Sequence, residues 1–355
     1  MKKYFCFIIL LIIETNAIAQ TQNNIHFYKA GNPLLQYTGR IDFSNSLLPK
    51  CWCPGVYMRA TFKGISCEVI INDEVLYGTY HNYISIVVDN NQPIRIKLTG
   101  KTNIIKIPGK LTNKTHTIII AKSTECGIGY IEFAGIKCGT LLPSSAKPLR
   151  KIEFIGNSIT CGMSSDLTIP CETGDWYDQH NAMLSYGVLT ARALNAQWQL
   201  TAESGIGLVH SCCDKPIVMP QVFDKIDLRD DSIQWNFKKY QPDVVTICLG
   251  QNDGIQDSTV FCTAYIKFIK RLRSYYPFAT VICLTSPMAD NTLLPVLKKY
   301  LSAIVNKANA DGDKNVKKYF FSKRYYHSCG GHPTLYEHQQ IAEELTSFIK
   351  KVKKW

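Results

Sequence analysis

Four short stretches of the sequence carry groups that suit acyl transfer: GNSIT with Ser158, ESGIG with Gly205, GQND with Asn252 and GGHP with His332. Acyl transfer needs a nucleophile, a base that takes its proton, and donors aimed at the developing oxyanion. Ser158 supplies the hydroxyl and His332 the base. The backbone N–H groups of Ser158 and Gly205 and the side-chain amide of Asn252 are expected to form the oxyanion hole. Serine chemistry of this kind needs neither a metal nor a cofactor, and we expect none.

Each of these residues also has a purely structural interpretation. Ser158 can cap a helix, Gly205 can form a turn, Asn252 can bond its own backbone, and His332 can be a surface loop residue. The catalytic interpretation is favoured because all four residues fall at the same place in the predicted fold.

That place is one edge of a parallel sheet. From residue 146 onward, continuous apolar runs alternate with helical segments, which predicts a parallel sheet covered on both faces. The runs are KIEFI, WQLTAES, PDVVTICLG, ATVICLTSP and VKKYFFSK. In such sheets reactive groups gather at the carboxyl ends of the strands. The four stretches follow the first, second, third and last of these runs.

The final helix is predicted by apolar residues at three- and four-residue spacing, including Leu335, Ile341, Leu345 and Ile349. Thr334 with a glutamate three residues later, Glu337, forms a capping box that marks the helix start. GGHP is therefore expected in the loop just before this helix.

The part of the chain before residue 146 has a different pattern of apolar and polar residues. Runs at 56–63, 67–73, 83–89, 93–100 and 116–123 alternate between apolar and polar residues and are bounded by Gly, Pro, Asn or Asp. This pattern predicts an antiparallel β-sandwich. We expect a sandwich domain at 20–145 and an α/β domain at 146–355, with the boundary inside the segment LLPSSAKPLRK.

Residues 1–19 have the features of a secretory signal peptide: a basic start, a short apolar stretch, and Ala17-Ile18-Ala19 as a cleavage signal. The apolar stretch is too short to span a bilayer comfortably, and no later segment approaches that length. The sequence therefore predicts export to the periplasm or the medium without a membrane span.

The charge balance is basic. Removing Lys2, Lys3 and Glu14 with the signal peptide leaves 38 basic and 27 acidic residues, a net charge of +11 (38 minus 27). The lysines are scattered, and no nucleic-acid-binding motif accompanies them, so we expect no nucleic-acid partner.

Cysteine usage is high. The 14 cysteines include Cys6 in the signal peptide, and the remaining 13 leave at least one unpaired within the chain. Cys161 and Cys171 are the best disulfide candidates, because they would close a short loop after Ser158. The stretches HSCC (210–213) and HSCGGH (327–332) lack the paired spacing of a structural zinc site, so no metal is predicted.

The four blocks resemble those of the SGNH (GDSL-like) hydrolases, named for the Ser, Gly, Asn and His that correspond here to Ser158, Gly205, Asn252 and His332. This resemblance implies a flavodoxin-like α/β domain. The earlier stretches YTGRIDFSN and CWCPGVYMRATFKG resemble the jelly-roll-like β-sandwich that precedes this domain in carbohydrate esterase family 2, whose members remove acetyl groups from plant polysaccharides. The resemblance implies a secreted serine esterase acting on an acetylated polysaccharide or oligosaccharide.

Two positions depart from the superfamily pattern. Asn157 stands where the first block commonly has Asp, and Cys329 stands where the last block usually has Asp three residues before His. That carboxylate normally orients the histidine and stabilises the imidazolium. Family 2 includes Ser-His dyads, so the resemblance implies that His332 works without a carboxylate and is oriented by another group, such as a backbone carbonyl.

Two alternatives stay open at this stage. One is an esterase, thioesterase or lipase-like enzyme for a different acyl ester, and the other is a catalytically degenerate carbohydrate-binding protein. The sequence specifies neither the sugar and its hydroxyl position nor the oligomeric state.

Overall fold

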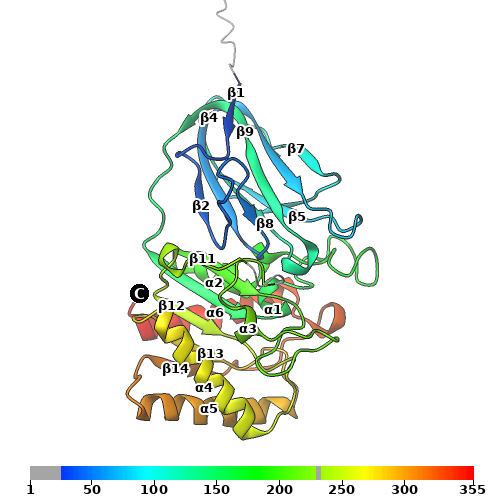
Figure 1. The fold of residues 1–355 in the computed structure, drawn as a ribbon. Helices are drawn as coiled ribbons and strands as arrows, with labels where there is room; N and C mark the ends of the chain where they lie inside the picture. The colour runs from blue at the N-terminus through cyan, green and yellow to red at the C-terminus, as the bar shows by residue number, and fades with distance from the viewer. Residues whose placement is uncertain (1–24, 229–232) are drawn as a thin grey trace, which may run out of the picture.

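The structure is a computed structural model that describes residues 25–228 and 233–355. It contains an antiparallel N-terminal sheet and a parallel C-terminal sheet with helices, one above the other in Figure 1. The expected signal peptide, 1–19, lies outside the described residues. No helix within them is long and apolar enough to cross a membrane.

The N-terminal sheet has nine strands, all paired antiparallel, with the order β1-β9-β4-β8-β5-β6 and with β2, β3 and β7 attached to β4 or β9. The strands are β1 (His26–Lys29), β2 (Gln36–Thr38), β3 (Lys50–Cys51), β4 (Tyr57–Asp73), β5 (Tyr83–Val88), β6 (Ile94–Lys97), β7 (Thr102–Lys106), β8 (Thr115–Lys122) and β9 (Ile131–Leu142). The expected antiparallel architecture is confirmed.

One boundary differs from the sequence prediction. The runs 56–63 and 67–73, expected as two strands, belong to the single strand β4. Gly64, at φ 148°, lies within a register shift between Lys63 and Cys67. Such a shift bends a strand without ending it, so β4 pairs with β8 along its first half and with β7 along its second.

The C-terminal sheet has the strand order β11-β10-β12-β13-β14, all parallel. The strands are β10 (Arg150–Gly156), β11 (Ala196–Ala202), β12 (Val244–Ile247), β13 (Thr280–Leu284) and β14 (Val316–Tyr319). Numbered from β10, this is the order 2-1-3-4-5 of flavodoxin-like folds, which confirms the fold class. The order reverses between β10 and β12, where such sheets bind their ligands.

Helices cover both faces of this sheet. The longer ones are α2 (Tyr186–Ala193), α4 (Ser258–Tyr275), α5 (Leu293–Ala310) and α6 (Leu335–Lys353). Side chains of α2 and α6 belong to one core cluster, and those of α4 and α5 belong to the other. Neighbouring residues of a strand, such as Val244 and Val245, point to opposite cores, which explains why these strands are apolar without alternation.

The two sheets share a buried interface. Phe62 and Ile71 of β4 lie in the same hydrophobic cluster as Ile155 and Ile247 of the parallel sheet. The Trp198 Nε1–H of β11 donates to the Gly55 carbonyl at 2.9 Å. The N-terminal sheet is therefore packed as part of the same core.

Candidate active site

Ser158 is the first residue of the short helix α1 (Ser158–Cys161), directly after β10. The turn needs Gly156, because a Cβ there would lie 2.0 Å from Thr160 Oγ1. The Asn157 side chain caps the helix by accepting a hydrogen bond from the Ile159 N–H. As the first residue of a helix, Ser158 has a backbone N–H with no intrahelical acceptor. The sequence thus places a hydroxyl and a donor N–H at the carboxyl end of β10.

His332 lies beside Ser158 although the two are 174 positions apart in the chain. Its Nε2 is 2.9 Å from Ser158 Oγ, and its Nδ1 is 3.2 Å from the Cys329 carbonyl oxygen. A carbonyl can only accept, so Nδ1 carries the proton and Nε2 is left to accept the Ser158 hydroxyl proton. The backbone carbonyl of Cys329 occupies the orienting position that a carboxylate has in a triad.

The site favours a neutral imidazole. Burial lowers the pKa of His332, while the backbone hydrogen bond to Cys329 works in the opposite direction. The neighbouring His180 and His338 are buried too, and burial lowers the pKa of His180 to about 4 and that of His338 to about 3. All three rings are therefore uncharged at neutral pH.

The loop that carries His332 is fixed at both ends. At its start, Glu337 of α6 accepts hydrogen bonds from the Tyr326 N–H and from His327. Burial alone would raise the pKa of Glu337, but these hydrogen bonds lower it to about 2. At its end, Thr334 and Glu337 form the capping box that the sequence indicates. His332 therefore lies in a short loop before α6 that is held in place on both sides.

A disulfide between Cys171 and Cys329 holds the middle of this loop. The sequence-based pairing of Cys161 with Cys171 is wrong in the structure, where Cys161 is a free, buried thiol. The physical reason is that Cys161 belongs to α1 and packs inward, whereas Cys171 lies on an exposed loop that reaches the His332 segment. Cys212 and Cys213 form a second disulfide, between adjacent residues.

The other two predicted residues follow neighbouring strands. Gly205, at φ 79°, lies in the loop after β11, and no described residue accepts a hydrogen bond from its N–H. Asn252 lies after β12, and its Nδ2 donates to the Ile206 carbonyl at 2.9 Å. That contact uses one of the two amide hydrogens and ties the Asn252 loop to the Gly205 loop.

Two carboxylates that the sequence interpretation missed support these loops. Glu125 comes from the N-terminal domain, is 1% exposed, and accepts the Ser204 N–H at 2.7 Å, next to Gly205. Asp253 is buried and accepts the N–H groups of Leu208, Val209 and His210. Asp253 follows Asn252 in the GQND block, so the sequence offered a signal for it. Nothing around Glu125 in the sequence points to this site.

The arrangement can perform acyl transfer, because a serine hydroxyl faces the acceptor nitrogen of a neutral imidazole and backbone donors lie at adjacent strand ends. The histidine and cysteine stretches at 210–213 and 327–332 take other roles, since His327 bonds Glu337 and three of the cysteines are in disulfides. Within 25–228 and 233–355, no group of three or more His, Cys, Asp or Glu side chains is placed to hold a metal ion.

Comparison with known proteins agrees with both sheets. Residues 37–145 match the family described as carbohydrate esterase 2 N-terminal, and residues 154–314 match the GDSL-like lipase/acylhydrolase family. The solved structure of a family two carbohydrate esterase from Clostridium thermocellum in complex with cellohexaose is 32% identical, with a TM-score of 0.83 over 90% of this chain and 99% of that one. The chain belongs to carbohydrate esterase family 2.

Other relatives extend this comparison. A family two carbohydrate esterase structure from Cellvibrio japonicus has a TM-score of 0.84 at 25% identity, over 94% of this chain and 99% of that one. An acetylxylan esterase / glucomannan deacetylase of Cellvibrio japonicus is 26% identical over 96% of this chain and 95% of its own length. Cellulase/esterase CelE of Acetivibrio thermocellus is 34% identical over 91% of this chain, which spans 40% of CelE's own length.

Proposed function

We propose that this family 2 esterase removes O-acetyl groups from a carbohydrate, with Ser158 as nucleophile and His332 as general base and acid. The observation that carries the proposal is the pair of His332 contacts, Nε2 to Ser158 Oγ at 2.9 Å and Nδ1 to the Cys329 carbonyl at 3.2 Å. They fix both the position and the tautomer of the base. A Ser-His dyad is therefore the proposed catalytic unit.

The reaction proceeds in two halves. Ser158 Oγ attacks the acetyl carbonyl carbon as its proton passes to His332 Nε2, and the resulting oxyanion accepts hydrogen bonds from the Ser158 and Gly205 N–H groups and the Asn252 amide. His332 then protonates the departing sugar oxygen, which leaves an acetyl-serine. In the second half, water gives a proton to His332 Nε2 as its oxygen attacks the acetyl carbonyl carbon. His332 then returns this proton to Ser158 Oγ as the bond to the acetyl group breaks, which frees Ser158 and releases acetic acid, and the acid ionises to acetate.

The proposed substrate is an acetylated polysaccharide or oligosaccharide, such as acetylated xylan or glucomannan. Support comes from the names of the relatives, two of which are acetylxylan esterases / glucomannan deacetylases. The same proposal includes export, based on residues 1–19, and a division between the β-domain at 20–145 and the hydrolase domain at 146–355.

Hydrolysis of a chromogenic acetyl ester, together with mass spectrometry of acetate release from acetylated xylan, glucomannan and simple acetylated sugars, tests the proposal. Ser158→Ala is expected to abolish turnover on every ester and leave the thermal unfolding midpoint unchanged, because the side chain contributes little to packing. Ser347→Ala, an exposed serine of α6, is the matched control and should retain full activity.

The alternatives give distinct results. Faster release of longer acyl groups than of acetate would favour a lipase-like or thioesterase activity. Carbohydrate binding without turnover of any ester would indicate a degenerate, non-catalytic protein. Either result would contradict the proposal, as would a Ser158→Ala variant that keeps most of its activity.

A further inference from the structure

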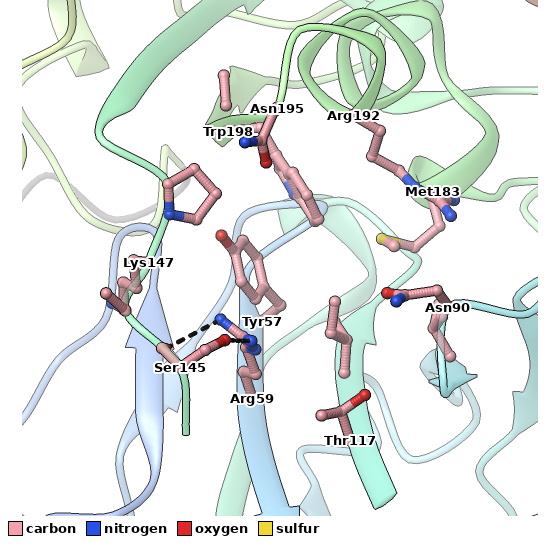
Figure 2. Close-up of a pocket in the computed structure, with 15 residues that line it drawn as sticks. Tyr57, Arg59, Asn90, Thr117, Ser145, Lys147, Met183, Arg192, Asn195 and Trp198 are labelled. Atoms are coloured by element: carbon pink, nitrogen blue, oxygen red, sulfur yellow. Dashed lines mark hydrogen bonds between the residues drawn. The ribbon is translucent and has the colours of Figure 1, made fainter. Parts of the chain in front are cut away.

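A cavity of about 470 Å³ lies between the two domains (Figure 2), and Ser158 is not among the residues that line it. On one side it is lined by residues of β4, β5 and β8, and on the other by the end of α2 and the start of β11. The segment 145–148, which joins the two sheets, closes a third side. The cavity is therefore a feature of the domain junction.

The cavity and Ser158 are at opposite ends of the parallel strands. Lys147 and Pro148 precede β10 and Ala196 begins β11, whereas Ser158 and Gly205 follow the other ends of these strands. Seven residues of extended chain span roughly 20 Å. A ligand in this cavity would not contact the esterase site.

The side chains that line the cavity carry positive charge only. Arg59, Lys147 and Arg192 line it, and none of the residues that line it is Asp or Glu. The Arg59 guanidinium donates to the backbone and hydroxyl oxygens of Ser145, and Lys147 Nζ donates to the Tyr37 carbonyl. Among residues 25–228 and 233–355, both cations therefore have only neutral hydrogen-bond partners. Within the described residues, the Arg192 side chain forms neither a hydrogen bond nor an ion pair, although the Arg192 backbone carbonyl accepts the Asn195 N–H. A negatively charged ligand would supply the missing charge.

The cations also destabilise one another. Burial lowers the pKa of Lys147, and the positive charges of Lys151 and Arg59 lower it further. The Arg192 side chain remains exposed, and the partial burial of its guanidinium lowers its pKa as well. An anion placed among these groups relieves repulsion as well as forming new ion pairs.

The other lining groups suit a sugar ring. Asn90 and Asn195 point their amides toward the cavity from opposite sides (Figure 2) and are exposed. Tyr57 packs against Trp198 with ring centroids 4.3 Å apart and the ring planes tilted by 31°, which gives an aromatic wall. Amides bind hydroxyl groups and aromatic walls bind the apolar faces of rings. A bare inorganic anion would use neither.

A second hollow of about 290 Å³ adjoins this cavity, because Lys147 lines both. It adds Lys151 and Lys239 and likewise has no carboxylate in its lining. The positive charge therefore continues beyond a single sugar-sized space.

We propose that the junction cavity binds a uronate, a sugar residue bearing a carboxylate, as part of a saccharide. The carboxylate pairs with Arg59, Lys147 and Arg192, since a guanidinium matches a carboxylate in two parallel hydrogen bonds. The sugar hydroxyls bond Asn90 and Asn195. A volume of about 470 Å³ is within the range of small-ligand sites. This binding does not depend on the chemistry at Ser158.

Isothermal titration calorimetry of the whole protein at low salt tests the site, with the methyl glycoside of glucuronate as probe. The methyl glycoside of glucose differs by lacking the carboxylate, and inorganic phosphate provides charge without a sugar. We expect the glucuronoside to bind at least tenfold more tightly than either. Added salt should weaken its binding, because ion pairs contribute to it.

Substitutions of single residues test whether the glucuronoside binds in this cavity. Arg192→Gln should weaken glucuronoside binding at least tenfold and leave chromogenic acetyl ester turnover unchanged. Lys299→Gln, an exposed cation on α5, removes the same charge elsewhere and should leave binding unchanged. If the unfolding midpoint of Arg192→Gln falls, Lys147→Gln replaces it in the same comparison.

Three results would overturn the proposal. Equal affinity for the glucuronoside and the glucoside would exclude carboxylate recognition. Phosphate that binds as tightly as the glucuronoside would indicate a general anion site. Undiminished binding by folded Arg192→Gln and Lys147→Gln would place the ligand elsewhere.

Discussion

In the proposed Ser158–His332 dyad, the histidine is oriented by the dipole of a backbone carbonyl and not by the charge of a carboxylate. The Cys329 carbonyl fixes the Nδ1 proton, but it cannot stabilise an imidazolium as strongly as a carboxylate would. Glu125 contributes a favourable charge from a greater distance, and burial outweighs it. The geometry therefore sets the tautomer of His332 without raising its basicity.

The pH dependence of kcat/KM should reflect this. Only neutral His332 can accept the Ser158 proton, so activity is lost as the pH falls through its pKa. Because burial lowers that pKa from the ordinary value of about 6.5, the rate should rise at an apparent pKa below 6.5 and stay high into mild alkali. A rate that reaches its plateau only well above pH 7 would show that an unidentified anion stabilises the imidazolium.

Asn252 is expected to act on the transition state. Removing one oxyanion donor typically costs about 10² to 10³ in kcat. Asn252→Ala should lose activity of that order, with a smaller change in KM, in steady-state assays on an acetyl ester. Its contact with Ile206 also joins two loops, so the unfolding midpoint must be measured alongside. An unchanged kcat in a folded variant would remove Asn252 from the oxyanion hole.

At the scale of elements, the loops after the strands are held by tethers that differ in kind. The His332 loop is tied by the Cys171–Cys329 disulfide and by Glu337, whereas the Gly205 loop is tied by Glu125 and Asp253. All are side chains that lie outside the reacting pair. They hold the loops at the strand ends in fixed positions relative to one another.

Removing the disulfide tests whether it contributes to stability alone or also to catalysis. The double variant Cys171→Ala/Cys329→Ala should unfold at a lower temperature but reduce kcat only modestly, because the Cys329 backbone carbonyl remains. Losing a triad aspartate, by comparison, costs on the order of 10⁴. Kinetics and thermal melts of the double variant check this, with Cys262→Ala, a partly buried free cysteine on α4, as the control. A loss near 10⁴ in a folded variant would contradict this and would mean that the disulfide is needed to hold His332 in its working position.

The sequence predicts the parallel sheet well because each of its strands is a continuous apolar run that ends in a distinctive block. It predicts the α6 start equally well, through Thr334 and Glu337. It fails for β4, because Gly64 makes a bulge where its residue type usually marks a turn. It also fails for Cys171 and Glu125, whose partners are set by tertiary packing over long separations and leave no local pattern.

At the scale of the whole molecule, an ion pair with no solvent exposure joins the domains. Arg40, after β2, contacts Glu153 of β10 at 3.0 Å, and both side chains are 0% exposed. Arg40 Nη1 also donates to the Phe223 and Lys225 carbonyls. Since the hydrophobic cluster is continuous across the same interface, we expect the two domains to unfold in one transition.

Arg40→Met tests this coupling. It leaves Glu153 buried without its cationic partner, although Thr201 Oγ1 still donates to the carboxylate, and such a loss typically costs about 3–5 kcal/mol. Calorimetry should show a single transition at a lower temperature, and Arg40→Met/Glu153→Met should recover part of the loss. Lys307→Met, which removes the exposed pair with Asp311, should cost no more than about 0.5 kcal/mol. Two separate transitions in the parent protein would show that the domains unfold independently.

The contact between Glu125 and the Ser204 N–H means that the boundary of the esterase site does not follow the boundary between the domains. A hydrolase domain separated from its β-domain would lack the carboxylate that accepts this N–H in the turn before Gly205. A chimera with another β-domain keeps the contact only where that domain places a carboxylate at the equivalent point of the 123–129 turn. The β-domain thus contributes to the proposed active site as well as to the fold.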